Sequence, residues 1–442
     1  MSKDFEFKVE WQPAPGVTTP ELAATWARYE IWVGDRCVTQ VEAADGTFRR
    51  SVYGALYPLA YWIASNWWLL TSHIRPTAIE SGYWTWRNVR TQPWLRQHNV
   101  RAAGDGMAWP DLTLVPEGAV TRVHWSQDRY RGLGAVRFAS DGTGFVPSDD
   151  FREHLAKIVN HVLDRLAEAE LVKTPLAEEW EGVADSDGEE ISFCKTAARL
   201  GLDPYSVSDE TADRIINAAA VLPAEIAGDF FDSADASNLS AALDWTRSAV
   251  LEADKVAVRA DRSLNEIPRA VAEQVASFRN ASDERPWQLG YAMARALRGE
   301  LALADTDDFD IAPWVGTADM QAPTRGLDGL AAVNGQRCGV VLGTVNHRLE
   351  ARRFGQARAL GRILARPGQR QFILSAARSH DDRVARAFAA ELLAPAQGIR
   401  HMLETLGAAD DSALETIAEL FNVSPLVVRH QYENQIAVLL ES

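Results

Sequence analysis

Tryptophan is distributed unevenly along this 442-residue chain, and that distribution divides it. Eleven of the fifteen tryptophans lie within the first 150 residues. Because single hydrophobic cores stop growing well below this chain length, we expect two or three domains. The change in composition predicts an aromatic-rich domain over residues 1–147, followed by domains of a different character.

The first block combines the patterns of strands and of a helix. Residues 5–11 alternate apolar with charged side chains, which is typical of a half-buried strand. Residues 29–38 contain Gly34 and Asp35 between two apolar runs and predict a hairpin. A helix and two short strands are also expected, over residues 53–70, 120–125 and 135–138. The block is therefore predicted to be a small α+β domain, whose ligand the sequence does not reveal.

Several aromatic residues of this block stand in pairs or short runs. They are Trp67, Trp68, Tyr83, Trp84 and Trp86. Tryptophan has a large flat face and one polar group, so these side chains could line a binding groove. Packing within the core and the sheet is the more common role of such residues. The sequence favours packing but does not separate the two interpretations.

Residues 148–284 are predicted to be helical. Ser148 is a suitable N-cap for a helix over residues 149–168, whose apolar residues recur at helical spacing. The acidic segment at residues 178–190 lacks periodicity and is interpreted as a linker. Two helices then flank a Gly-Leu-Asp-Pro turn at residues 201–204. Such a pair is either a DNA-reading helix-turn-helix or a structural helical hairpin, and its acidic flank favours the hairpin.

Charge and cysteine content exclude several classes of protein. The formal net charge is −16, which argues against a surface coated for nucleic acid. The three cysteines lie far apart and form neither a disulfide framework nor a zinc-finger pattern.

The first residues lack an apolar signal core, and the most apolar stretch, residues 56–70, is shorter than the ~20 residues of a membrane span. We therefore expect a cytoplasmic protein without a membrane partner.

The C-terminal part, residues 285–442, carries the most informative order of motifs. A strand pair is expected around the Asn334-Gly335 turn. The pieces that follow, in chain order, are Arg353-Phe354, a helix over residues 355–364, Phe-Ala-Ala-Glu-Leu-Leu-Ala-Pro at residues 388–395 and Phe-Asn-Val-Ser-Pro at residues 421–425.

This order resembles the ImmA/IrrE family of bacterial zinc metallopeptidases over about a third of the chain, residues 285–435. In that family an Arg-Phe pair leads into a helix bearing His-Glu-x-x-His, and a second helix supplies the third metal ligand. The two histidines lie one turn apart, so both imidazoles reach one Zn²⁺, and the glutamate activates the metal-bound water. The resemblance implies a zincin-like fold for residues 285–442.

The residues at the motif positions differ from those of the family. Aligning the Arg-Phe pair places Arg358 and Arg362 at the histidine positions and Ala359 at the glutamate position, while Asp382 falls on the third ligand. An arginine does not release its proton to become a ligand, and an alanine cannot act as a base. We therefore expect a pseudo-metallopeptidase with no catalytic residue, no bound metal and no other cofactor.

No other part of the sequence restores a metal site or a catalytic motif. His347, His380 and His430 each lack a His, Asp or Glu partner four residues away in the same helix. The sequence also contains no phosphate-binding loop, no Gly-x-Ser-x-Gly and no Gly-x-Gly-x-x-Gly. The residues therefore indicate no second class of enzyme.

Arginine is concentrated where the metal motif would be. Residues 346–400 contain eleven arginines, no lysine and four acids, which gives 11 − 4 = +7. Arg358, Arg362 and Arg366, the arginine stripe, recur every four residues and lie close to one face of the expected helix. In one interpretation Arg358 or Arg362 pairs with Asp382 and replaces zinc structurally. In the other, the stripe binds an anion or a partner.

The resemblance implies a bacterial regulatory setting. Members of the family are associated with helix-turn-helix repressors in stress response, mobile elements and phage-related loci. We expect a non-catalytic regulatory or sensing protein that binds a protein partner, such as a helix-turn-helix regulator. Two alternatives remain open. The first is an active zinc metallopeptidase with relocated ligands that cleaves a repressor, and the second is a regulator that binds DNA or a nucleotide through Arg353 and the arginine stripe.

Overall fold

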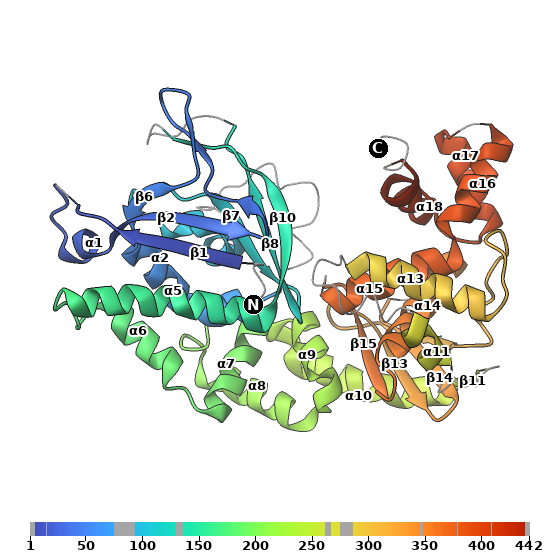
Figure 1. Ribbon diagram of the computed structural model, residues 1–442. Helices are drawn as coiled ribbons and strands as arrows, with labels where there is room; N and C mark the ends of the chain where they lie inside the picture. The colour runs from blue at the N-terminus through green and yellow to red at the C-terminus, as the bar shows by residue number, and fades with distance from the viewer. Residues whose placement is uncertain are drawn as a thin grey trace. The chain divides into compact units, whose positions relative to one another are not determined.

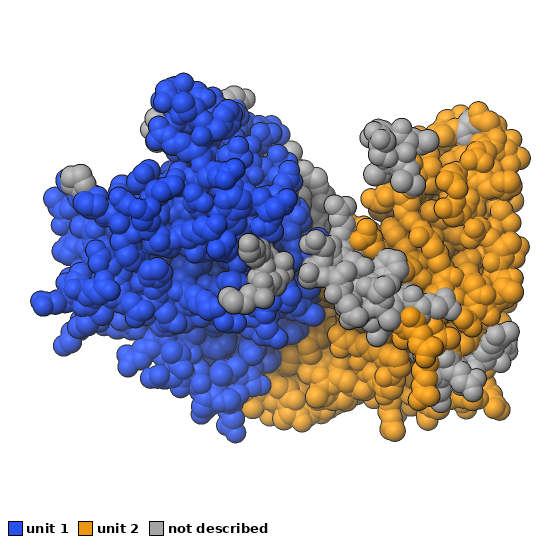
Figure 2. Space-filling view, viewed as in Figure 1, with its two compact units in different colours: residues 1–212 blue, residues 213–442 orange. Residues whose placement is uncertain are grey.

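The computed structural model describes residues 5–14, 16–74, 93–129, 136–260, 267–274, 286–344, 348–377, 379–407 and 409–437. These residues form a mixture of helices and strands, as expected for an α+β protein. The chain divides into two compact units, residues 1–212 (unit 1) and 213–442 (unit 2), which are coloured separately in Figure 2.

The described strands of unit 1 form three small antiparallel sheets. The first contains β1 (Phe5–Trp11), β2 (Trp26–Val33), β3 (Arg36–Cys37) and β6 (Val52–Ala55). The second contains β7 (Asp111–Pro116), β8 (Val120–Ser126) and β10 (Gly142–Pro147), and the third β4 (Val41–Glu42), β5 (Phe48–Arg49) and β9 (Arg137–Phe138). The strand expected over residues 5–11 and the hairpin expected over residues 29–38 are confirmed.

Helices of unit 1 pack beside these sheets. They are α1 (Pro20–Ala24), α2 (Tyr57–Ser65), α3 (Trp67–Ser72), α4 (Pro93–His98), the 3₁₀ turn η3 (Val100–Ala103), α5 (Ser148–Glu168), α6 (Pro175–Ala184) and α7 (Gly188–Arg199), while α8 (Asp209–Val221) crosses the unit boundary. Helices α5 and α6 lie below the strands of unit 1 in the view of Figure 1. The long helix α5 packs on the first sheet, where the rings of Phe151 and Phe5 lie 5.3 Å apart. Ser148 begins this helix but does not cap it, because its hydroxyl donates to the Gly118 carbonyl oxygen at 2.8 Å.

Two expectations for unit 1 were wrong. The helix expected over residues 53–70 is strand β6 followed by α2 and α3, because residues 52–55 pair with β2 and the helix is interrupted at Asn66. The linker expected at residues 178–190 is mostly helical. The Thr174 side chain caps α6, and the Asp187 carboxylate caps α7 by accepting two backbone N–H bonds. Capping therefore holds this acidic segment in two helices.

The paired tryptophans pack within unit 1. Trp68 is buried, and its indole N–H donates to the Tyr205 hydroxyl at 3.2 Å. The Trp67 ring lies edge-on to Trp180, with 5.0 Å between the ring centres. Helix α7 packs Cys194 against the same tryptophan pair, which agrees with a structural role for this helix. The other aromatic residues considered for a groove, at positions 83, 84 and 86, lie outside the described residues.

Unit 2 is built on one mixed sheet. Its strands are β11 (Val258–Arg259), β12 (Gly316–Asp319), β13 (Leu327–Asn334), β14 (Arg337–Leu342) and β15 (Gln371–Ser375). The order is β11-β14-β13-β15 with antiparallel pairing, and β12 runs parallel to β14. Gly335 has a φ of 64° in the turn between β13 and β14, a conformation that favours glycine. The expected strand pair is therefore confirmed.

Helices cover both faces of this sheet (Figure 1). They are α9 (Ala224–Ser233), the 3₁₀ turn η4 (Ala236–Asn238), α10 (Leu239–Val256), α11 (Ile267–Gln274), α13 (Pro286–Glu300), α14 (Leu349–Ala365), α15 (His380–Leu393), α16 (Ala396–Leu406), α17 (Asp411–Leu420), α18 (Pro425–Gln431) and the π-helix η5 (Tyr432–Ala437). The core contains Leu360 of α14 and Phe388 of α15. Within the described ranges, every helix is too short or too polar to cross a bilayer.

The two units differ from the three domains expected from composition. The expected boundaries fall at residues 147 and 284, whereas the units meet at residues 212 and 213. Helix α5 packs with the sheets of unit 1, and α10 packs on β13 and β14 of unit 2. The helical region is thus shared between two cores in the structure.

Candidate functional site

The site expected from the motif positions lies between α14 and α15, which pack side by side. Arg358 and Arg362 lie one turn apart on α14, and Asp382 lies in the first turn of α15. All three are buried, with exposed fractions of 6%, 2% and 1%. Buried charges need partners of opposite sign, so the contacts of these side chains decide what the site can do.

Arg358 joins three parts of unit 2. One terminal nitrogen (Nη1) donates to Asp328 Oδ2 on β13 at 2.7 Å. The other (Nη2) donates to the Ser375 carbonyl oxygen at 2.7 Å and lies 3.5 Å from Asp382 Oδ1. The ion pair expected between an arginine of α14 and Asp382 is therefore present.

Arg362 connects α14 with α9 and α15. Its Nη2 donates to Asp229 on α9, and its Nη1 lies 3.4 Å from Asp381 Oδ2 on α15. Arg366, at the end of the arginine stripe, also pairs with Asp381 but leaves about half of its side chain exposed. The stripe thus passes from the core to the surface along a row of carboxylates.

A fourth arginine completes the group. Arg386 of α15 donates to the Ser375 carbonyl oxygen at 2.8 Å and lies 3.4 Å from Asp328 Oδ2. We refer to these eight residues together as the Arg–Asp cluster, which consists of Arg358, Arg362, Arg366, Arg386, Asp229, Asp328, Asp381 and Asp382. Its four positive and four negative charges cancel, which is what a buried cluster requires.

The connection from β15 to α15 fixes the position of Asp382. The Ser379 hydroxyl is the N-cap of α15 and accepts from the Asp382 backbone N–H at 3.2 Å. The same hydroxyl donates to Asp382 Oδ2 at 2.8 Å, and the Ser375 N–H donates to Oδ1 at 3.3 Å. These bonds from the backbone and the cap position the carboxylate in addition to its contact with the arginine.

Burial and the arginines act in opposite directions on the aspartates. Burial raises the pKa of Asp229 to about 6 although Arg362 lowers it, and burial likewise raises the pKa of Asp382 against the neighbouring arginines. Burial also acts to raise the pKa of Asp381. There, the hydrogen bond from His380 and the charges of Arg362 and Arg366 outweigh burial, so the pKa of Asp381 lies below its usual range. The cluster therefore contains carboxylates with opposite pKa shifts.

The residues at this site do not fit a zinc ion. Guanidinium groups donate hydrogen bonds and carry positive charge, so Arg358 and Arg362 exclude a cation from the positions where ligands would lie. Ala359 is buried in the core and offers no base. Across the described ranges, no group of three His, Cys, Asp or Glu side chains could hold a metal ion. His380 is engaged with Asp381, His430 is exposed on α18, and His347 lies outside the described residues.

Arg353 has a separate role. Its Nη1 donates to the carbonyl oxygens of Phe421 and Asn422 at 2.9 and 2.7 Å. Its Nη2 donates to Asp308 Oδ1 at 2.7 Å and to the Phe309 carbonyl oxygen at 2.8 Å. This side chain therefore holds the start of α14 to the segment after α17.

Sequence reasoning missed four members of the Arg–Asp cluster: Asp229, Asp328, Asp381 and Arg386. Asp328 could have been singled out from the sequence, because an aspartate in a mostly apolar strand needs a partner for its charge. Asp381 was visible beside Asp382 but lay outside the family pattern. Asp229 and Arg386 lie on amphipathic helices, where charged residues normally face water, so nothing marked them.

Comparison of the chain with models of known protein families and with curated proteins gives no match.

Proposed function

We propose that unit 2 is a metal-free scaffold of the ImmA/IrrE metallopeptidase kind, and that the protein is a non-catalytic cytoplasmic regulator that binds a protein partner. The observation that carries this proposal is the Arg–Asp cluster. It joins α14 and α15 through the positions where the family would hold its metal. The three cysteines, Cys37, Cys194 and Cys338, are all free and buried, which fits a reducing compartment.

A metal held by two residues of one helix and one of the next ties the two helices together. Here Arg358 and Asp382 make that link with opposite charges, and Arg362 extends it to Asp229 and Asp381. Guanidinium–carboxylate contacts can therefore replace the structural contribution of the metal. They supply no metal ion to acidify a bound water, so the zinc-dependent hydrolysis of the family is not expected of this site.

The same contacts disfavour binding of DNA or a nucleotide by the arginine stripe. Arg358 and Arg362 are almost completely buried and paired with aspartates. An incoming phosphate would have to displace an aspartate from its buried arginine, which would leave that carboxylate buried without a partner. Only Arg366 offers a substantial exposed surface, and one cation paired with Asp381 makes a weak anion site.

Restoring the histidines tests whether these are the ligand positions of the family. The variant Arg358→His/Arg362→His is expected to bind about one zinc per chain, since Asp382 can supply the third ligand. The matched variant Arg358→Gln/Arg362→Gln loses the same charges without gaining ligands, and is expected to bind none. Elemental analysis after dialysis and circular dichroism measure metal content and folding.

Two results would contradict the proposal. A folded histidine variant that binds no zinc would show that the two positions are not ligand positions. Wild-type protein that retains about one zinc through dialysis, or cleaves a helix-turn-helix repressor in a zinc-dependent manner, would show that a working metallopeptidase site exists elsewhere in the chain.

The protein partner has its own test. Purified wild-type protein carrying an affinity tag is mixed with a helix-turn-helix repressor encoded beside its gene, and complex formation is measured by size-exclusion chromatography. We expect a stable complex and an uncleaved repressor. Failure to form a complex with any such repressor would remove the partner from the proposal and leave the metal-free scaffold standing.

A further inference from the structure

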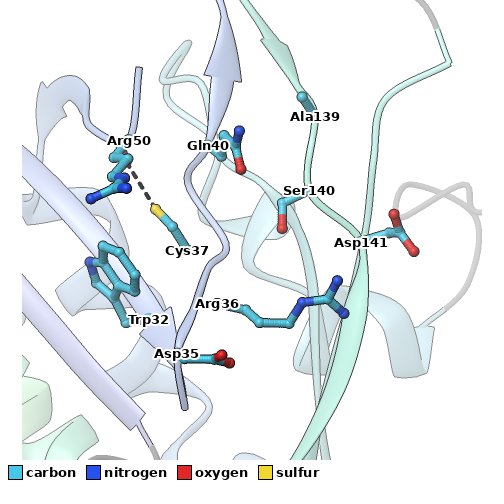
Figure 3. A pocket seen from close by; sticks show the side chains of 9 residues that line it. All are labelled: Trp32, Asp35, Arg36, Cys37, Gln40, Arg50, Ala139, Ser140 and Asp141. Carbon is cyan, nitrogen blue, oxygen red and sulfur yellow. Dashed lines mark hydrogen bonds between the residues drawn. The ribbon is translucent and has the colours of Figure 1, made fainter. Parts of the chain in front are cut away.

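The hairpin of β2 and β3 in unit 1 borders a hollow of about 370 Å³. Its lining includes Trp32, Asp35, Arg36, Gln40, Arg50 and Asp141 (Figure 3). Trp32 and Arg50 lie on one side, and Arg36 extends toward Ser140 and Asp141 on the other. The lining is thus mainly polar and charged, with one aromatic ring.

Two arginines of this hollow lie more than 4.0 Å from every carboxylate in the part of the chain that the structure describes. Lys8, Arg28 and Arg49 on the neighbouring strands each lie within 4.0 Å of a glutamate or aspartate. Among the described residues, Arg36 and Arg50 have no such contact, and Arg50 lies over the Trp32 ring with 5.6 Å to its centre. In a chain with a net charge of −16, two such arginines beside one hollow mark a place suited to an anion.

A second hollow of about 570 Å³ adjoins the first, since Arg50 lines both. Phe48 and Tyr53 line it with exposed fractions of 61% and 50%. Tyr53 is paired with Arg28 across β6 and β2, so the two side chains lie on the same face of the sheet. Exposed aromatic rings beside arginines are suited to stacking against a planar group.

We propose that the two hollows form one binding site for a nucleotide. The phosphate is bound by Arg36 and Arg50, whose planar guanidinium groups match phosphate oxygens. The base stacks on Phe48 or Tyr53, and the hydroxyl and amino groups of the sugar and base donate to Gln40 and Asp141. Both volumes fall in the range of roughly 300–1,000 Å³ that is usual for small-ligand sites.

A nucleotide fits this site better than an acidic peptide. Asp35 and Asp141 border the first hollow and would repel a run of carboxylates. The same two groups accept hydrogen bonds from hydroxyl and amino groups, which a nucleotide has at the end away from its phosphate. The site lies wholly within unit 1, so it does not depend on the function proposed for unit 2.

Binding is tested on the full-length protein by isothermal titration calorimetry with adenosine monophosphate, adenosine triphosphate and inorganic phosphate. Arg36→Gln and Arg50→Gln are each expected to weaken nucleotide binding about tenfold or more. Phe48→Ala is expected to weaken nucleotide binding but not phosphate binding. Arg247→Gln removes the same charge from an exposed arginine of unit 2 and serves as the matched control, with a change of less than about twofold. All four side chains are exposed, so circular dichroism should show unchanged folding.

A single-stranded thymidine octamer distinguishes a free nucleotide from the nucleotides of a chain. Tighter binding of the octamer than of the monophosphate, lost in the same variants, would assign the site to single-stranded nucleic acid and overturn the proposal of a free nucleotide. Equal binding of inorganic phosphate and nucleotides, or equal binding by wild-type protein and the two arginine variants, would overturn the proposal. Binding of a polyglutamate peptide without nucleotide binding would also overturn it.

Discussion

At the scale of single residues, the Arg–Asp cluster stabilises the fold only as long as it is complete. Its charges balance, yet Arg358 Nε and Arg362 Nε are buried and have no hydrogen-bond partner among the described residues. A buried ion pair stabilises the folded state little more than an apolar contact of the same size does, because burial removes the water that solvates both charges. Removing one partner is much more costly, since the other charge then stays buried alone.

The first prediction follows from this asymmetry. Replacing Arg362 by methionine leaves Asp229 and Asp381 without their buried partner, and we expect the free energy of unfolding to fall by about 3–5 kcal/mol. Arg366→Met removes an arginine that is half exposed, and a loss below about 1 kcal/mol is expected. Denaturant unfolding followed by circular dichroism gives both values. Equal losses in the two variants would show that burial does not control the contribution of these arginines.

The second prediction concerns pH. Burial raises the pKa of Asp229 from its ordinary value of 3.8 to about 6, so the folded protein binds this proton more tightly than the unfolded chain. Stability from this group is therefore present at low pH and is lost as pH rises from about 4 to about 6. Relative to Asp229→Asn, wild-type protein should lose roughly 1–3 kcal/mol of unfolding free energy across that window. A relative gain would show that Arg362 dominates over burial and holds the pKa of Asp229 below its ordinary value.

At the scale of elements, the Arg–Asp cluster depends on the close approach of helices. Gly290 of α13 faces α15, where an added Cβ atom would lie 2.4 Å from the Val384 carbonyl oxygen and 2.8 Å from the Ala387 side chain. The backbone of α15 cannot yield without moving the cap at Ser379 and the carboxylate of Asp382. Packing of α13 therefore helps to set where α15 places its charges.

The third prediction tests this packing. We expect Gly290→Ala to destabilise the protein by about 1–3 kcal/mol, because the new methyl group overlaps backbone atoms. Gly299→Ala, near the end of the same helix, brings a methyl group near no described atom beyond its chain neighbours and the nearby backbone of its own helix, and should be neutral or stabilising by up to about 1 kcal/mol. Thermal and denaturant unfolding of both variants measure the difference. Similar effects at both positions would mean that α13 and α15 are less closely packed than described.

At the scale of the whole molecule, each unit has its own core of apolar side chains, and among the described residues no group of three His, Cys, Asp or Glu side chains could hold a metal ion. The contacts that join α14 and α15 in unit 2 are ionic and come from the chain itself. Stability of the protein should therefore not depend on metal.

The fourth prediction follows from that statement. The midpoint of thermal unfolding should change by less than about 1 °C when a strong chelator or excess zinc is added, because ligand binding stabilises only a protein that has a site for it. Differential scanning calorimetry of wild-type protein provides the measurement. The Arg358→His/Arg362→His variant serves as the comparison, and its midpoint should rise with zinc. A fall of several degrees with chelator in wild-type protein would contradict a metal-free scaffold.

Much of the local structure could be predicted from the sequence, because it depends on patterns over a few residues. The alternation over residues 5–11, the glycine turn at Gly335 and the helical spacing in α5 all produced the expected elements. The helix expected over residues 53–70 begins later in the structure, and the reason is non-local. Its first expected residues pair with β2, a strand more than twenty residues earlier in the chain. The expectation of a linker at residues 178–190 was wrong because Thr174 and Asp187 cap two helices there, and this capping stabilises helical structure despite the acidic composition.

By itself, the sequence determined the order of the C-terminal motifs, the arginines at positions 358 and 362, and the absence of a metal-ligating side chain at those two positions. It could not determine which carboxylates would match those charges. Asp229 lies more than 130 residues before Arg362, and Asp328 lies 30 residues before Arg358. Only the packing of α9, β13, α14 and α15 brings them together, because the position of a buried partner follows from which surfaces meet in the core and not from spacing along the chain.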